Sequence, residues 1–149
     1  MRVYLCGTIT ADPATHSWRA IATEQLTLSG HVALNPLRKK DLTQIAPDGL
    51  SMLVGAEPVL FVERDERDIR SADVLLMNTL GIEKLERQSI GTWAEMGLAR
   101  GHRIPIVVIA DHPSVLGHPF VIKWAAAVVP TLREALQIAD WLADGPEMW

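Results

Sequence analysis

Short apolar runs alternate with longer segments of helical periodicity, and this alternation constrains the fold more than any other feature of the chain. Each apolar run has the length of a strand, and a helical pattern precedes or follows it. Strands that alternate with helices build a parallel sheet with helices on both faces. The sequence therefore predicts an α/β fold, a three-layer α/β/α sandwich around a five-stranded parallel sheet of the Rossmann or flavodoxin-like type. The predicted strands are 2–6, 31–35, 74–78, 104–110 and 125–129.

Capping signals define the helices expected between these strands. Asp12 followed by Pro13 predicts a helix start, because aspartate caps a helix and proline fits its first turn. Thr131 and Glu134 form a capping box at the start of the last helix. Residues 36–57 match no regular element, and a connection this long serves either as a lid or binding loop or as a plain surface loop. The predicted helices are 12–30, 59–71, 89–100 and 131–142.

Composition excludes several classes of protein. The 149 residues include 14 basic and 18 acidic side chains, a net charge of −4, whereas binding to polymeric nucleic acid needs clustered lysine and arginine. Lone Cys6 excludes an internal disulfide and a cysteine-built zinc site, and the histidines lack metal-ligand spacing. No apolar run approaches the roughly 20 residues that span a bilayer, and no secretory signal is visible. We expect one domain over residues 1–149, cytoplasmic, with no polymeric nucleic acid, membrane or metal among its ligands.

The segment from Ser89 onward carries the clearest indication of a ligand site. Ser89 is placed to cap a helix, and Gly91 and Thr92 then lie in its first turn. The free N–H groups and the positive dipole end of such a turn favour an anionic or polar ligand. Glu95 lies on the same helical face as Gly91, one turn further along. Because Gly91 has no side chain, a ligand at the first turn can reach the Glu95 carboxylate. The alternative interpretation is an ordinary helix with a surface glutamate.

A second carboxylate of interest lies in the charged run 63–73. Such runs are usually solvated helix faces, but Asp65 can instead form a pair with Glu95. Breaking a glycosidic bond uses two carboxyl groups, one at C1 and one that manages the proton of the leaving group. Tyr4, the only tyrosine, either packs in the core or reaches this site with its hydroxyl.

Three motifs follow one another along nearly the whole chain. They are Tyr4-Leu5-Cys6-Gly7-Thr8-Ile9, Asp65-x-x-x-Ile69-x-x-Ala72-Asp73 and Gly91-x-x-x-Glu95-x-Gly97-x-Ala99. In this order they resemble the nucleoside 2-deoxyribosyltransferase family. The resemblance implies that Glu95 is a nucleophile that attacks C1′ of deoxyribose, that Asp65 assists proton transfer at the base, and that Tyr4 hydrogen-bonds the catalytic carboxylate. It also implies a homo-oligomer, and no cofactor, because the leaving base is activated by protonation.

Two departures from the transferase pattern leave the reaction open. Transferases typically carry an aspartate where this chain has Ser89, and their polar residue from a later loop has no match in 123–128. The serine resembles instead the branch that hydrolyses nucleoside 5′-monophosphates, in which it binds phosphate with the first loop. A non-catalytic nucleotide-binding or signalling module on the same scaffold is the alternative of another class. The substrate-binding residues expected from the resemblance are Gly7, Thr8, Ser89, Gly91 and Thr92, with Arg38 as the cation for a phosphate.

Overall fold

The sheet of the protein has five parallel strands. A computed structural model describes residues 1–10, 12–38, 58–81 and 89–143, so most of the predicted connection 36–57 lies outside the described residues. The strand order is β2-β1-β3-β4-β5, and every neighbouring pair is parallel. This is the flavodoxin-like order, and it confirms the predicted fold class. The strands are β1 (Arg2–Gly7), β2 (Val32–Leu34), β3 (Val74–Asn78), β4 (Ile106–Ile109) and β5 (Ala127–Val129).

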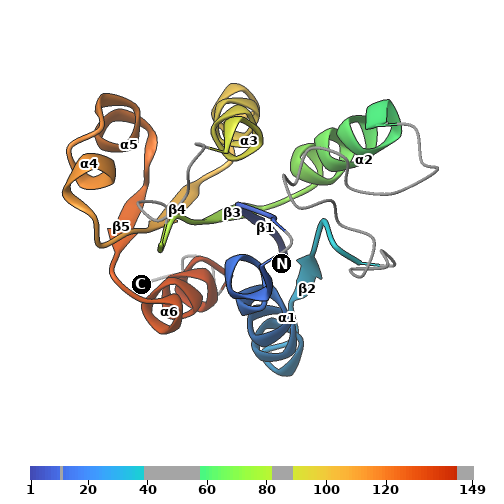
Figure 1. The fold of residues 1–149 in the computed structure, drawn as a ribbon. Coiled ribbons are helices and arrows are strands. Elements are labelled where there is room, and N and C mark those ends of the chain that lie inside the picture. Colours follow the sequence, from blue (N-terminus) through green and yellow to red (C-terminus); the bar gives the residue numbers. More distant parts are fainter. Residues whose placement is uncertain (11, 39–57, 82–88, 144–149) are drawn as a thin grey trace.

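Helices cover both faces of this sheet (Figure 1). On one face α1 (Trp18–Leu28) and α6 (Leu132–Ala143) pack on a core that contains Val3 and Leu5 of β1. The other face carries α2 (Pro58–Arg70) and α3 (Ile90–Gly101), with α4 (Pro113–Leu116) and α5 (Pro119–Trp124) towards β5. Alternate residues of a strand point to opposite faces. Tyr4 and Cys6 therefore face the layer of α2 and α3, and their side chains are fully buried there.

The predicted start of the first helix is wrong. Asp12 caps only a single 3-10 turn, η1 (Pro13–Thr15), where its carboxylate accepts a hydrogen bond from the Ala14 N–H at 2.9 Å. The backbone leaves the helical region at His16, with φ −134° and ψ −12°, and α1 begins at Trp18. Aspartate and proline mark a first turn, but they do not determine whether the chain continues in a helix beyond it. The break places Arg19 in the first turn of α1.

Two short helices replace the loop predicted between β4 and β5. Both α4 and α5 begin with a His-Pro pair, and the Nδ1 atoms of His112 and His118 accept hydrogen bonds from the backbone N–H groups of Ser114 and Phe120. Histidine is not among the preferred capping residues, so the sequence pattern did not indicate these starts. The strand after α5 is also shorter than predicted, because Ala125 is the C-cap of that helix.

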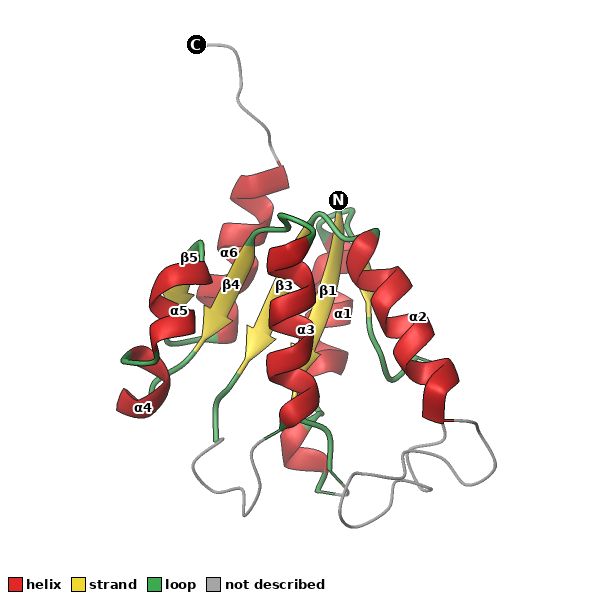
Figure 2. Ribbon diagram, turned by 90° about the horizontal axis from the view of Figure 1, so that it is seen from above, coloured by secondary structure: helices red, strands yellow, loops and turns green. Residues whose placement is uncertain are grey.

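The carboxyl ends of all five strands point to one edge of the sheet (Figure 2). Three segments lie at this edge: the turn after β1, residues 35–38 after β2, and the N-terminus of α3. In open parallel sheets ligands bind at this edge, where neighbouring strands lead to helices on opposite faces. In this strand order that point lies between β1 and β3. Within the described ranges, no helix combines the length and apolar character that crossing a bilayer requires.

Candidate active site

A hydrogen bond between β1 and α3 forms the centre of the candidate site. The Tyr4 hydroxyl donates to Glu95 Oε1 at 2.9 Å. Tyr4 is 0% exposed, whereas Glu95 is half-buried in the middle of α3. Tyr4 thus both packs in the core and reaches the carboxylate with its hydroxyl. The bond joins two residues 91 positions apart in the chain, so only the packing of α3 on the sheet brings them together.

The environment of Glu95 raises its pKa from 4.5 to about 7. Burial is the largest cause, because it disfavours the charged carboxylate, and the negative charge of Asp65 adds to the rise. Hydrogen bonding from Cys6 and Tyr4 and the positive charge of Arg19 lower the pKa. At neutral pH, Glu95 therefore divides between its ionised and protonated forms. A carboxylate held near neutrality in this way is typical of catalytic sites.

Tyr4 and Cys6 act on Glu95 as protonated groups. Burial raises the pKa of both side chains well above their usual values, and the charge of Glu95 raises them further. The Cys6 thiol also contacts the Thr92 carbonyl oxygen at 3.5 Å. In the sequence Cys6 served only to exclude a disulfide and a cysteine-built zinc site, and its side chain is fully buried. Its place beside Glu95 was missed, although a residue two positions after Tyr4 faces the same side of the sheet.

Asp65 approaches the same site from α2. Its charge acts on both Glu95 and Tyr4, so the two carboxylates belong to one electrostatic cluster. Asp65 Oδ1 lies 3.3 Å from Arg64 Nη2, and both side chains are largely buried. Arg64 also donates to the carbonyl oxygen of Pro36. This arginine therefore ties α2 to the segment after β2 and holds a positive charge against Asp65.

The N-terminus of α3 presents the predicted polar groups. Ser89 Oγ caps the helix by accepting hydrogen bonds from the Thr92 N–H at 3.4 Å and from Thr92 Oγ1 at 2.7 Å. Both bonds use the serine oxygen as acceptor, which leaves its hydroxyl hydrogen for another partner. A Cβ placed on Gly91 would meet no heavy atom within 4 Å in the described part of the chain. Among the described residues, therefore, no side chain or backbone group fills the position beside Gly91.

Gly7 and Thr8 end β1 and begin the turn after it. A Cβ on Gly7 would lie 2.9 Å from the Asn78 carbonyl oxygen and 3.3 Å from Arg19 Nη2. Glycine at this position thus has a packing reason besides its predicted role at the ligand. The carbonyl oxygens of Gly7 and Thr8 accept hydrogen bonds from Arg19, and Thr8 is partly exposed.

Arg38 forms an ion pair with Asp68, a carboxylate other than Asp65 and Glu95. Its Nη2 lies 2.6 Å from Asp68 Oδ2, and its Nη1 donates to the Asn35 carbonyl oxygen at 3.0 Å. The Asp68 side chain is only 7% exposed, so this pair anchors the segment after β2 to α2. A phosphate at Arg38 would share the guanidinium with Asp68, and that role stays a prediction.

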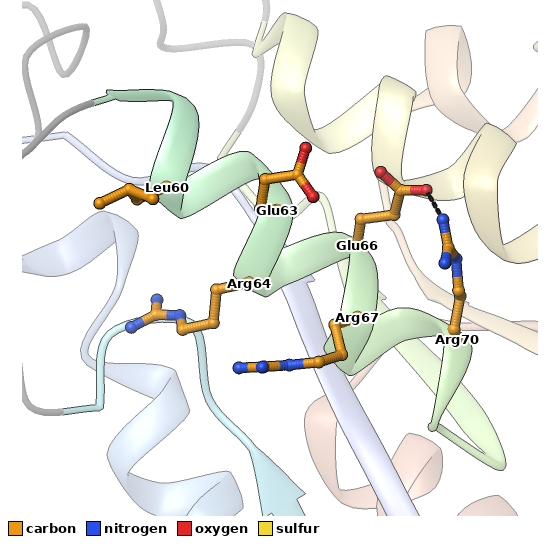
Figure 3. A pocket seen from close by; sticks show the side chains of 6 residues that line it. All are labelled: Leu60, Glu63, Arg64, Glu66, Arg67 and Arg70. Carbon is orange, nitrogen blue, oxygen red and sulfur yellow. Dashed lines mark hydrogen bonds and ion pairs between the residues drawn. The ribbon is translucent and has the colours of Figure 1, made fainter.

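A surface pocket of about 390 Å³ lies along α2 (Figure 3), and of the residues described above only Arg64 lines it. Tyr4, Asp65 and Glu95 are not among its lining residues. One helix supplies the whole lining, which includes acidic and basic side chains. The candidate site is therefore the cluster around Glu95 and not this pocket. Its lining residues are Leu60, Glu63, Arg64, Glu66, Arg67 and Arg70.

The groups of the candidate site suit covalent chemistry with proton transfer. They comprise a carboxylate with a pKa near neutrality, a second carboxylate, a hydroxyl, a thiol and an open helix N-terminus. A search for clusters of three or more histidine, cysteine, aspartate or glutamate side chains suited to a metal found none in residues 1–10, 12–38, 58–81 and 89–143. A nucleophilic carboxylate assisted by a second carboxyl group can cleave a glycosidic bond.

Comparisons with known proteins bear on the family and the fold of the chain. The family model described as nucleoside 2-deoxyribosyltransferase matches residues 3–124. No curated protein sequence matches the chain.

Among solved structures, the 2-deoxyribosyltransferase of Bacillus psychrosaccharolyticus has a TM-score of 0.64 and 14% identity, over 91% of this chain and 90% of that one. The CMP N-glycosidase of Clostridium botulinum has a TM-score of 0.59 and 16% identity, over 95% and 99% of the two chains. The 2-deoxyribosyltransferase of Leishmania mexicana has a TM-score of 0.67 and 13% identity, over 94% and 97%. At these identities the likeness shows a shared fold.

Proposed function

Because the chain belongs to the nucleoside 2-deoxyribosyltransferase family, we propose that it cleaves the N-glycosidic bond of a 2′-deoxynucleoside or its 5′-monophosphate. The observation that carries the proposal is the 2.9 Å hydrogen bond from the Tyr4 hydroxyl to Glu95. It directs a proton donor onto a carboxylate whose pKa is about 7, beside the charge of Asp65. Two carboxyl groups in one site are what glycosidic cleavage requires.

In the first step the ionised Glu95 attacks C1′ of the sugar. A bond forms between a Glu95 oxygen and C1′, and the bond from C1′ to the base nitrogen breaks with its electron pair going to the base. In this step the two carboxyl groups share one proton, and when Glu95 is ionised that proton lies on Asp65, which delivers it to the departing base. Tyr4 holds Oε1 and so orients the other oxygen of Glu95 towards the sugar.

In the second step an acceptor releases the sugar from Glu95. Water or an incoming base gives a proton to Asp65 and forms a bond to C1′, while the bond between C1′ and Glu95 breaks and the carboxylate is restored. Two displacements at C1′ retain its configuration. With water as acceptor the enzyme is an N-glycosidase, and with a base it is a transferase.

The N-terminus of α3 supports a phosphate on the substrate. The hydroxyl hydrogen of Ser89 and the first-turn N–H group of Gly91 are donors suited to an anion. The Thr92 N–H already donates to Ser89 Oγ and so holds the serine in place. Thr8 lies at the partly exposed start of the turn after β1. These residues form the proposed 5′-phosphate site, with Arg38 as its cation. Substitution Arg38→Met should then raise KM for a deoxynucleoside 5′-monophosphate about tenfold and leave KM for the deoxynucleoside unchanged. Equal KM changes for both substrates would contradict this role.

An assay of product formation tests the proposed function. The purified protein is incubated with deoxynucleosides and with their 5′-monophosphates, with and without a free acceptor base, and the bases are separated by chromatography. Free base without acceptor identifies a hydrolase, and exchange only with acceptor identifies a transferase. Saturable binding without turnover identifies the binding module and refutes the proposal.

A pair of glutamine variants separates the role of Glu95 from that of glutamate in general. Glu95→Gln should lower turnover at least a thousandfold, because the amide cannot form the covalent intermediate. Glu24→Gln makes the same chemical change on the exposed face of α1 and should keep full activity. Near-normal rates for Glu95→Gln, in protein with an unchanged circular dichroism spectrum, would exclude Glu95 as nucleophile.

We also infer that the protein forms a homo-oligomer. An aromatic stack joins α3 to α5, with ring centroids 5.0 Å apart for Trp93 and His118 and 4.5 Å apart for Phe120 and Trp124. Phe120 remains 52% exposed and neighbouring Ile122 is 69% exposed. Exposed aromatic and aliphatic side chains of this kind suit a subunit interface. Light scattering should give a mass above 16.4 kDa, and a monomer at micromolar concentration would contradict the inference.

A further inference from the structure

Arg19 is a buried cation whose contacts are backbone carbonyls. Its side chain extends from the first turn of α1 and is 1% exposed. Nε donates to the Leu5 carbonyl oxygen at 3.2 Å, Nη2 to that of Gly7 at 2.6 Å, and Nη1 to that of Thr8 at 3.3 Å. None of the ion pairs within the described ranges includes Arg19. Since a buried charge is unfavourable without compensation, this position requires an explanation.

The three acceptor carbonyls belong to the strand that carries the site. Leu5 and Gly7 lie in β1 on either side of Cys6, and Thr8 begins the following turn. The planar guanidinium, with its fork of donors, fixes the relative positions of all three carbonyls. Trp18 closes over it, with the Arg19 Cζ atom 4.8 Å from the ring centroid. The end of β1 is therefore held rigidly from the α1 side.

Arg19 and Glu95 come from helices on opposite faces of the sheet, α1 and α3. α1 packs on the face with Val3 and Leu5, whereas α3 packs on the face with Tyr4 and Cys6. The low polarity between them screens their attraction less than water does. Arg19 lowers the pKa of Glu95, and the charges of Glu95 and Asp65 in turn favour the charged form of Arg19.

We propose that Arg19 is a positioning residue of the active site, which fixes the end of β1 and supplies the positive charge that balances Glu95 across the sheet. The inference rests on, and extends, the proposed function of Glu95. Together with the hydrogen bonds from Cys6 and Tyr4, which act more strongly, the charge of Arg19 opposes the effect of burial on the pKa of Glu95. The other groups that act on Glu95 are Tyr4 and Cys6 from β1 and Asp65 from α2. None of these three groups carries a positive charge, whereas Arg19 does.

A titration of Glu95 without substrate tests the electrostatic part. The protein is labelled with glutamate carrying ¹³C at the carboxyl carbon, and the Glu95 signal is identified by its loss in Glu95→Gln. Arg19→Met should move the midpoint of Glu95 upward by about half a pH unit or more. The matched control Arg100→Met removes an exposed positive charge from α3 itself and should leave the midpoint unchanged. An unshifted midpoint in folded Arg19→Met would overturn the proposal.

Arg19→Lys separates charge from geometry. Lysine keeps the positive charge, so the titration midpoint of Glu95 should stay near that of the unchanged protein. Because lysine offers one nitrogen in place of three, the backbone amide signals of Gly7 and Thr8 should move. Unmoved amide signals would overturn the positioning role, and a midpoint raised in spite of the retained charge would overturn the electrostatic role. This variant also decides the question if Arg19→Met does not fold.

Kinetics then connects the inference to the reaction. If the protein is active, the acidic limb of the pH profile of kcat/KM should follow the Glu95 midpoint in each Arg19 variant. A limb that stays fixed while the midpoint moves would overturn a role of Arg19 in catalysis. If no substrate is turned over but the midpoint still moves, the proposed function fails, whereas the charge balance between Arg19 and Glu95 stands.

Discussion

Replacing Glu95 with glutamine should stabilise the protein, and increasingly so as the pH rises. The pKa of Glu95 is about 7 in the folded protein against an ordinary 4.5, so the folded state binds this proton more tightly than the unfolded chain does. The proton linkage therefore favours the folded state fully below about pH 4.5, and this contribution is lost as the pH rises towards 7. Glutamine cannot ionise, but its amide oxygen can still accept the hydrogen bond from Tyr4.

The size of the effect follows from the two pKa values. A rise from 4.5 to about 7 corresponds to about 3 kcal/mol of folding free energy between the low-pH and high-pH limits. Between pH 5 and pH 8, about 2.5 kcal/mol of this difference should be expressed. Other carboxylates titrate in the same range, but their effects cancel when the variant and the unchanged protein are compared at each pH.

Urea unfolding followed by tryptophan fluorescence measures this difference, because the chain contains five tryptophans. The free energy of unfolding is determined at several pH values for the unchanged protein, Glu95→Gln and the exposed control Glu24→Gln. Coincident fluorescence and circular dichroism transitions establish two-state behaviour. The advantage of Glu95→Gln should grow with pH, and that of Glu24→Gln should stay near zero. A pH-independent difference for Glu95→Gln would refute the argument that burial raises the pKa of Glu95.

Three further substitutions test neighbouring parts of the site. Tyr4→Phe removes a hydrogen bond that favours the charged form of Glu95, so kcat/KM should fall about 10- to 100-fold. The acidic limb of the pH profile of kcat/KM should move to higher pH. A loss of less than twofold contradicts this. Gly7→Ala should lower the free energy of unfolding by about 1–3 kcal/mol, because the new Cβ meets the Asn78 carbonyl oxygen at 2.9 Å. Urea titration measures this loss, and a value under about 0.5 kcal/mol speaks against the prediction. Asp65→Asn should slow the release of poorly leaving bases most, and equal losses across a series of bases would exclude its proton role.

The predicted strands agree with the observed ones because their signal is local. A buried parallel strand is a continuous apolar run wherever it lies in the sheet, so 74–78 was predicted with the observed bounds of β3. Helix starts depend on more distant contacts. Asp12 and Pro13 form a capped turn as expected, but the chain bends again at His16 before α1 begins.

Burial decides the partners of Arg19 and Arg38, and the sequence alone does not determine that burial. Arg19 shares helical spacing with the buried Ala22 and Leu26, which places it on the inner face of α1. That spacing was the one available signal for its role, yet an arginine inside a helix is usually exposed. Arg38 follows a strand at the ligand edge, but a buried carboxylate, that of Asp68, lies against it. Which carboxylate meets which cation is decided by how α2 lies against the segment after β2.

The sequence by itself determined the α/β class, the membership of the family and the position of Glu95 one turn inside a capped helix. All three depend on periodicity, capping or motif order, which are properties of neighbouring residues. The family resemblance already implied that Tyr4 hydrogen-bonds the catalytic carboxylate. Only the tertiary structure gave the packing that makes this contact, the charge of Asp65 acting on both groups, and the place of Arg19 at the end of β1. The strand order brings β1 between β2 and β3, and packing on both faces then removes water from these groups. The packing gives these side chains their partners, and the loss of water shifts their pKa values. No local pattern in the chain determines either.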